Sequence, residues 1–303
     1  MDLDHIVAFV AVARHGGFAR TSSALHLSQP AISRRIALLE RELAAALFER
    51  LPRGAALTDA GRALLPHAEA VLASVRDGAD AVAAVRGTGA GTVTLALVGT
   101  LASTALTERL RDFREAHPGV DLRLQTAVSG EVSALVLRGD AVLGLRYGHD
   151  DHPGLAGTTI HHERLLPICA ADHRLAGARR IAPEALVDER WIGFPKRSTT
   201  PNEPYTSAIE QRLAACGLGD ADTVPIDSLT SQKRLVEAGF GIALVPESSV
   251  HDELRAGTLR ALSIPAMRAT VPVVLIHRRR GFQSGATRAL IATLAPVPCD
   301  ARS

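Results

Sequence analysis

The spacing of apolar residues changes once along this 303-residue chain, and the change separates two parts with different expected secondary structure. Up to about residue 86, apolar residues recur every three or four positions, which is the helical period. From Thr92 onward, short apolar runs of strand length alternate with helical segments. Between the two parts lies the glycine-rich segment 87–91, whose composition is that of a flexible hinge. The length of the chain agrees with two or three folding units.

Four helices are predicted in the first part. The first begins near Leu3 and ends at the Gly16-Gly17 pair, and the second covers residues 19–25. Ser28 is the expected N-cap of the third helix, which continues to Leu43. A turn at residues 52–54 follows. The fourth helix, over residues 59–86, is longer than a small core needs, which suggests a dimerisation or spacer element.

The second part alternates between strands and helices. Strands are expected at residues 93–98, 120–127, 141–145, 165–170, 191–194, 242–245 and 271–277, and helices at 102–116, 131–137, 204–216, 229–238 and 284–294. This alternation predicts an α/β fold with a mostly parallel sheet and enough units for two lobes.

Residues 18–40 have the dimensions of a helix-turn-helix, in which the helix that begins at Ser28 would enter the major groove of DNA. Amides and hydroxyls of its first turn suit phosphate, glutamine can pair with adenine, and arginine with guanine. Arg53, in the turn after the third helix, would be a wing contact to the backbone or the minor groove. The candidate DNA-binding residues are therefore Ser28, Gln29, Pro30, Ser33, Arg34, Arg35 and Arg53.

The overall charge neither supports nor opposes that interpretation. The formal net charge is +2, and residues 1–65 hold eight arginines against six carboxylates. Taken alone, the Arg34-Arg35 pair would favour the simpler alternative of three packed helices with a solvated basic face.

The first 65 residues closely resemble the LysR-type transcriptional regulator family. The resemblance is carried by Phe9, Gly17-Phe18, Leu25, the run 28–33, Leu39-Glu40, Leu43, the run 47–50 and the run 57–61. The chain departs from the family pattern at Thr21-Ser22, where an alanine pair is usual, and at Ala44, where glycine is usual. These departures concern packing and the turn before Leu47.

The resemblance extends more loosely over the remaining residues and implies a sensor of the periplasmic-binding-protein type, with two α/β lobes around a ligand cleft. Its marker is the run 236–246, and residues 146–148 suggest the branch of glycine-cleavage and β-lactamase regulators, although His152 and Val142 depart from that branch. The implied division is a winged helix-turn-helix at 1–58, a linker helix at 59–86, a hinge at 87–91 and an effector-binding domain at 92–303, with lobe I at 92–164 and 267–295 and lobe II at 165–266.

Ligands of parallel α/β lobes bind beyond the carboxyl ends of strands, where helix N-termini point amides into the cleft. The candidate effector-binding residues are Thr100, Leu101, Ser103, Ser129, Arg146, Phe194, Ser198 and Thr199. The family resemblance places Thr100 and Ser129 at effector-contact positions, but each hydroxyl could instead be a helix cap. Arg146 and the Lys196-Arg197 pair would favour a small anionic metabolite if they face inward, whereas a solvated surface position is equally compatible.

Other motifs give little support to metal binding, cofactors or catalysis. His149, His152 and the run 161–163 have metal-ligand residue types, but their loop-like or strand-edge sequence favours a hydrated surface. Cys169, Cys216 and Cys299 are far apart and form no CxxC pair, which opposes a zinc site or a disulfide framework and favours spare thiols over the remaining alternative of a redox-sensing pair. The chain contains no P-loop, zinc-protease helix or nucleophile elbow. We therefore expect no metal, no cofactor and no enzymatic activity.

The leading interpretation is a transcriptional regulator that binds double-stranded operator or promoter DNA and responds to a small-molecule effector. A homodimer or homotetramer and contact with RNA polymerase are expected. The N-terminus lacks a secretory signal and no run is long enough to span a membrane, so a cytoplasmic location is expected. The alternatives are a cytosolic small-molecule-binding protein without a regulatory role and an enzyme that uses the cleft.

Overall fold

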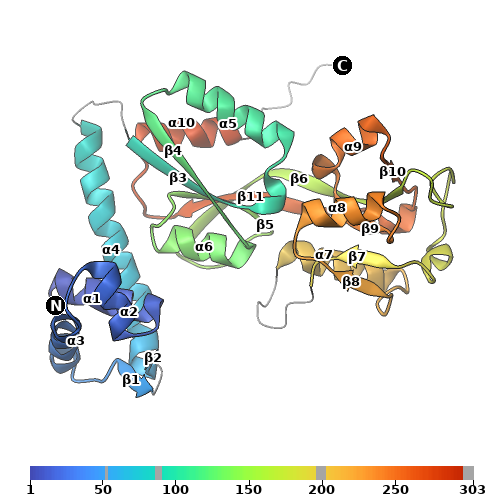
Figure 1. Ribbon diagram of the computed structural model, residues 1–303. Coiled ribbons are helices and arrows are strands. Elements are labelled where there is room, and N and C mark those ends of the chain that lie inside the picture. Colours follow the sequence, from blue (N-terminus) through green and yellow to red (C-terminus); the bar gives the residue numbers. More distant parts are fainter. Residues whose placement is uncertain (52–53, 86–90, 196–202, 296–303) are drawn as a thin grey trace. The chain divides into compact units, whose positions relative to one another are not determined.

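The computed structural model describes residues 1–51, 54–85, 91–195 and 203–295 (Figure 1). These residues form two compact units, one built mostly from Met1–Thr88 and the other from most of the remaining chain. Among the described residues, no helix has both the length and the apolar character needed to cross a bilayer.

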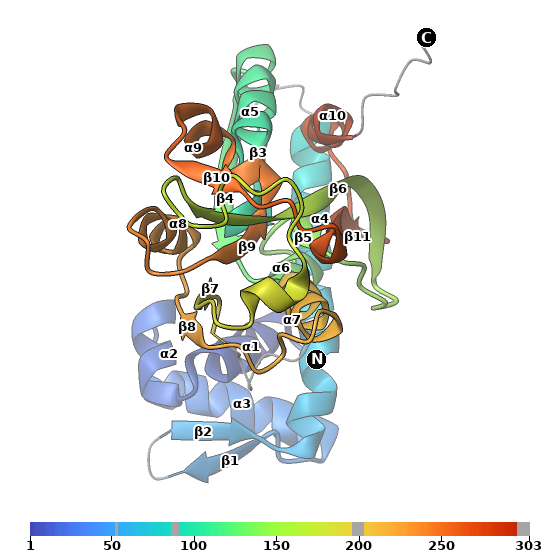
Figure 2. The ribbon, with the colours of Figure 1, turned by 90° about the vertical axis from the view of Figure 1, so that its right-hand side faces the viewer.

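The first unit contains the four expected helices and a two-stranded hairpin. The helices are α1 (Leu3–His15), α2 (Phe18–Leu25), α3 (Gln29–Leu43) and α4 (Asp59–Val85), and the strands are β1 (Phe48–Leu51) and β2 (Gly54–Leu57). The two strands pair antiparallel and form the wing of a winged helix-turn-helix (Figure 2). The apolar pattern had indicated only a turn here, because four-residue strands are too short to show alternation, whereas the family resemblance had implied the wing.

The core of this unit lies where α1, α3 and the wing meet. Phe9, Ile32, Leu39 and Leu47 are each at most 1% exposed, and the Phe9 and Phe48 ring centroids are 5.4 Å apart. The apolar period of each helix therefore faces a shared interior, as the sequence pattern predicted. The departure at Thr21 fits this interior, because its buried hydroxyl donates to the carbonyl oxygen of Gly17 at 2.8 Å.

Helix α4 begins against the wing and continues for 27 residues. Gly61 lies close to the chain just before β1. A β-carbon at this position would be 2.2 Å from the carbonyl oxygen of Leu47, so no larger residue fits without movement. Farther along, Val71, Val75, Val82 and Val85 are 40% to 88% exposed within this chain.

The second unit is built on one seven-stranded sheet in the order β10-β6-β11-β5-β3-β4, with β9 also paired to β6. Its strands are β3 (Gly91–Val98), β4 (Val120–Ala127), β5 (Leu143–Tyr147), β6 (Leu155–Ala170), β9 (Ala243–Pro246), β10 (Leu259–Ala261) and β11 (Ala269–Arg278). A separate pair contains β7 (Trp191–Gly193) and β8 (Thr223–Pro225).

The sequence predicted a mostly parallel sheet, and this prediction is wrong. Only the β3–β4 and β3–β5 pairs of the large sheet are parallel, whereas β6 and β11 make antiparallel pairs. The strand expected at 165–170 is the second half of β6, which is 16 residues long and runs through both lobes. His161, His162 and Glu163 are therefore interior residues of a strand rather than part of a loop. The sequence did not predict a strand over these residues, because their polar side chains interrupt the apolar pattern.

Helices flank the sheet on both faces. They are α5 (Thr104–Ala116), α6 (Ser129–Leu137), α7 (Pro204–Ala215), α8 (Leu229–Glu237), α9 (His251–Ala256) and α10 (Gly285–Leu294). Helices α5 and α10 lie on one face of the parallel strands and α6 on the other (Figure 1). We call the part with β3, β4, β5, α5, α6 and α10 lobe I, and the part with β7 to β10 and α7 to α9 lobe II.

No three metal-ligating side chains come together in the part of the chain that the structure describes. Cys169 is fully buried in β6, and burial raises the pKa of its thiol to about 11. Cys216 is half-buried and unpaired, and Cys299 lies outside the described residues.

Candidate functional site

The N-terminal end of α3 forms an exposed polar surface on the first unit. Ile32, Ile36 and Leu39 bury one side of the helix against the core, which leaves Ser28, Gln29 and Pro30 exposed at its start. The Ser28 hydroxyl caps the helix by accepting a hydrogen bond from the Ala31 amide at 3.3 Å. The Ala31 and Ile32 amides donate to Ser28, and Pro30 has no N–H. The backbone amide and the side chain of Gln29 are therefore the first-turn donors available to a ligand outside the protein.

The structure distinguishes the two arginines of α3, which the sequence could not. The Arg35 guanidinium lies 2.8 Å from the Asp4 carboxylate of α1. Arg34 is exposed and has no hydrogen bond or ion pair with any described residue. Ser33 is half-buried, and Arg53 lies outside the described residues. Of the two arginines, Arg34 is the one whose donors are available to bind DNA.

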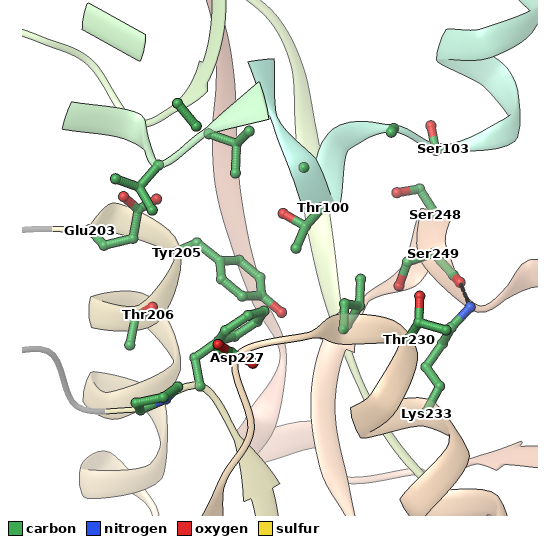
Figure 3. Close-up of a pocket in the computed structure, with 18 of the residues that line it drawn as sticks. Thr100, Ser103, Glu203, Tyr205, Thr206, Asp227, Thr230, Lys233, Ser248 and Ser249 are labelled. Atoms are coloured by element: carbon green, nitrogen blue, oxygen red, sulfur yellow. Dashed lines mark hydrogen bonds between the residues drawn. The ribbon is translucent and has the colours of Figure 1, made fainter. Parts of the chain in front are cut away.

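The second unit contains a cavity of about 750 Å³ at the carboxyl ends of β3 and β4, where residues from both lobes meet (Figure 3). Lobe I contributes Thr100 and Ser103, and lobe II contributes Phe194, Glu203 and Tyr205 from the start of α7 and the segment before it. Thr230 and Lys233 of α8 and Asp227 just before it extend the lining. Ser248, Ser249 and Glu253 extend it along α9 and the turn before that helix.

Three of the expected effector-binding residues line the cavity, whereas Leu101, Ser129 and Arg146 are not in its lining. Thr100, Ser103 and Phe194 are in the lining, whereas Leu101 is 5% exposed and packs inward. Ser198 and Thr199 lie outside the described residues. The alternative role of these hydroxyls was to cap a helix. Ser103 does not have this role, because its hydroxyl makes no capping hydrogen bond to α5.

Ser129 is fully buried and binds a carboxylate of the protein itself. Its backbone amide donates to Glu203 Oε2 at 2.9 Å, and its hydroxyl donates to Oε1 at 2.5 Å. Glu203 therefore lies at the N-terminus of α6, where a helix favours negative charge. Sequence reasoning did not identify Glu203, because 74 residues separate it from Ser129 and no local pattern connects them.

The aromatic wall of the cavity consists of Phe194 and Tyr205, and Tyr147 is packed against Tyr205 outside the lining. Tyr147 and Tyr205 stack with ring centroids 5.1 Å apart, and Phe194 meets Tyr205 edge to face at 5.8 Å. Thr100 donates a hydrogen bond to the phenolic oxygen of Tyr147 at 3.1 Å. Both tyrosines are buried, and burial raises the pKa of each phenol, so both stay neutral at physiological pH.

Arg146 is not in the lining of the cavity. It is 4% exposed, and its guanidinium lies 2.6 Å from the Asp150 carboxylate. Burial alone would raise the pKa of Asp150, but the hydrogen bond from the His152 backbone amide at 2.9 Å and the charge of Arg146 lower it. The pair is thus an internal structural ion pair that an approaching ligand does not meet.

Lys233 is the only lysine in the described lining, and its charge is already paired. Its ammonium donates to the Ser249 carbonyl at 2.8 Å (Figure 3). It also donates to the Glu253 carboxylate. Nearby, buried Glu163 accepts from the Ser248 amide at 3.1 Å and from the Ser248 hydroxyl at 2.8 Å. These bonds hold the turn before α9 against β6.

The chain matches two known family models. Residues 3–62 match the model described as "Bacterial regulatory helix-turn-helix protein, lysR family", and residues 86–297 match the "LysR substrate binding domain". A similar curated protein is the "RuBisCO operon transcriptional regulator" of Allochromatium vinosum. It is 26% identical over 279 residues, which are 92% of this chain and 90% of that protein.

Solved structures share the fold over the whole length. A full-length OxyR variant from Pseudomonas aeruginosa aligns with a TM-score of 0.74 at 18% identity, covering 97% of this chain and 94% of that one. Full-length CbnR in complex with its target DNA aligns with a TM-score of 0.56 at 25% identity, covering 97% and 98%. The subgroup suggested by residues 146–148 stays a prediction.

Proposed function

Because this chain belongs to the LysR family of bacterial transcriptional regulators, we propose that its operator binds at the start of α3 and its effector in the cavity between the lobes. The protein is a DNA-binding regulator with an effector-binding domain, and its relatives are regulators rather than enzymes. What we propose is which residues contact the operator and which residues contact the effector.

The observation that carries the DNA-binding proposal is the contrast between the two faces of α3. One face is buried by Ile32, Ile36 and Leu39, whereas Gln29 and Arg34 are exposed and without partners among the described residues. Glutamine and arginine are side chains that read base edges in the major groove. Ser28 and Ser33 would contact phosphate beside them, and Arg35 would act mainly by holding α3 to α1.

We propose the domain division expected from the sequence, with residues 1–58 as DNA-binding domain, 59–86 as linker, 87–91 as hinge and 92–303 as effector-binding domain. The exposed valines of α4 support pairing of two chains through this helix, because such an apolar stripe is unfavourable in water. An effector that favours one closure of the lobes would then reorient the paired recognition helices. RNA polymerase is a proposed partner when the operator adjoins a promoter.

The test of this function is selection of DNA by the full-length protein. Random duplexes are enriched by repeated binding, and the selected site is measured by mobility shift at fixed salt. We expect a site with two related halves, bound about a thousandfold or more tighter than unrelated DNA. Enrichment of no sequence, with the protein folded and oligomeric, would contradict the proposal. Retention of a small molecule without DNA binding would instead favour the non-regulatory binding protein.

A further inference from the structure

We propose that the effector is an organic cation, with an amine, amidine or guanidinium group that binds between Glu203, Asp227 and the aromatic wall of the cavity. This inference rests on the proposed function, since it takes the cavity as the effector site. It also revises the anionic effector expected from the sequence, for which Arg146 and the Lys196-Arg197 pair were the reason.

The described lining of the cavity is rich in negative charge. Five carboxylates belong to it, from Glu203, Glu210, Asp227, Asp252 and Glu253. Against them stands the single ammonium of Lys233, which Glu253 already neutralises. Like charges that share a partly enclosed space repel an incoming anion and attract a cation.

Among the described residues, the groups that would have bound an anion are already occupied; Lys196 and Arg197 lie outside the described residues. An anion at the N-terminus of α6 would need the amide and hydroxyl of Ser129, but both donate to Glu203. The guanidinium of Arg146 binds Asp150 and is buried away from the lining. An anionic effector would therefore have to displace one carboxylate of the protein and stay close to several others.

One end of the cavity carries groups that favour a cation. Figure 3 shows Glu203, Tyr205 and Asp227 toward one side and Ser103, Ser248, Ser249 and Lys233 toward the other. The Asp227 carboxylate is exposed and makes no hydrogen bond or ion pair with the described residues.

The rings of Phe194 and Tyr205 line the same cavity and contact each other. A cation held by a free carboxylate beside aromatic rings gains both a charge-assisted hydrogen bond and attraction to the ring face. Neither gain is available to an anion of the same shape.

Three nearly isosteric probes test the charge preference directly. Benzamidine is cationic at neutral pH, benzamide is neutral, and benzoate is anionic, and each is small relative to the cavity. The full-length protein is titrated with each probe at millimolar concentration, with binding followed by ligand-observed NMR. We expect benzamidine to bind roughly ten- to a hundredfold more tightly than benzoate, with benzamide between them.

Two variants locate the bound cation. Asp227→Asn keeps the shape and removes the charge, and we expect it to lower benzamidine affinity about tenfold while leaving benzamide unchanged. Asp172→Asn, at an exposed carboxylate outside the cavity, is the matched control and should leave all three affinities unchanged. Circular dichroism melts confirm that both variants are folded.

The outcomes separate this inference from the function on which it rests. Equal or tighter binding of benzoate, no binding of benzamidine, or equal effects of the two Asn variants would overturn the cationic effector, while operator selection by the wild type would stand. A wild-type protein that selects no operator contradicts the regulatory function whichever probe it prefers.

Discussion

The Thr100 hydroxyl donates its hydrogen bond to the phenolic oxygen of Tyr147, 3.1 Å away. Position 100 therefore has a structural partner as well as a place in the lining. Tyr147 is fully buried, so its oxygen depends on partners within the protein.

The first prediction is that Thr100→Val destabilises the effector-binding unit by about 1–3 kcal/mol, because it leaves the buried phenolic oxygen of Tyr147 without this donor. Thr100→Ser keeps the donor and should lose much less. Urea unfolding of both variants measures the difference. Unchanged stability of Thr100→Val would show that this hydrogen bond does not stabilise the fold.

The second prediction concerns the two arginines of α3. Arg34→Ala should weaken binding to the selected operator by about 1–3 kcal/mol and relax its sequence preference, because Arg34 is free to reach bases. Arg35→Ala is the matched comparison. It should affect operator affinity less and thermal stability more, because Arg35 already binds Asp4. Mobility shifts on the operator and on its single-base variants measure affinity and sequence preference. An unchanged affinity for Arg34→Ala contradicts the assignment of Arg34 as a base-reading residue.

Much of the fold was predictable from local patterns in the sequence. The helix cap at Ser28 and the strand at 120–127 were located correctly, because apolar period and end residues are local signals. The sheet direction was not, because β6 and β11 acquire their partners from distant segments. Glu203 and Asp227 were missed for the same reason, since only the folded chain brings the starts of α7 and α8 to one cavity.

The third prediction concerns the stability of the fold at low pH. Burial alone would raise the pKa of Glu163, but the hydrogen bonds from His161 and Ser248 outweigh it and hold the pKa below the ordinary 4.5. A carboxyl with a lowered folded-state pKa stabilises the fold above pH 4.5, and this contribution is lost as pH falls toward the folded-state value.

Glu163→Gln should therefore be less stable than the wild type near neutral pH and should lose less stability between pH 4.5 and lower pH. The control is Glu108→Gln, at an exposed residue of α5. Thermal unfolding across the acid range compares the three proteins. A Glu163→Gln curve parallel to that of the wild type would show that this carboxyl does not couple folding to protons.

The fourth prediction compares two glycines of α4. Gly61→Ala should destabilise the DNA-binding unit by several kcal/mol, because its β-carbon would be 2.2 Å from the carbonyl oxygen of Leu47. Gly78→Ala has open space around it and should stabilise the helix by about 0.5–1 kcal/mol. Denaturation followed by circular dichroism gives both changes. Similar values at the two positions would contradict the close packing of α4 against the wing.

The last prediction returns to Ala44, where the sequence departs from its family. Ala44 follows α3 with φ of 49°, and its backbone amide closes the helix onto the carbonyls of Glu40 and Arg41. This left-handed conformation disfavours a residue with a β-carbon and suits glycine. The turn before Leu47 is thus retained in spite of the alanine.

Ala44→Gly should accordingly raise the free energy of unfolding by about 1 kcal/mol, because it relieves that conformation at an exposed position where no side-chain contact is lost. Ala45→Gly is the control. Its φ is not positive, so glycine there only adds freedom to the unfolded chain and should be neutral or destabilising. Urea unfolding of the two variants beside the wild type measures the contrast. A loss of stability in Ala44→Gly equal to that in Ala45→Gly would mean that the left-handed turn after α3 carries no strain.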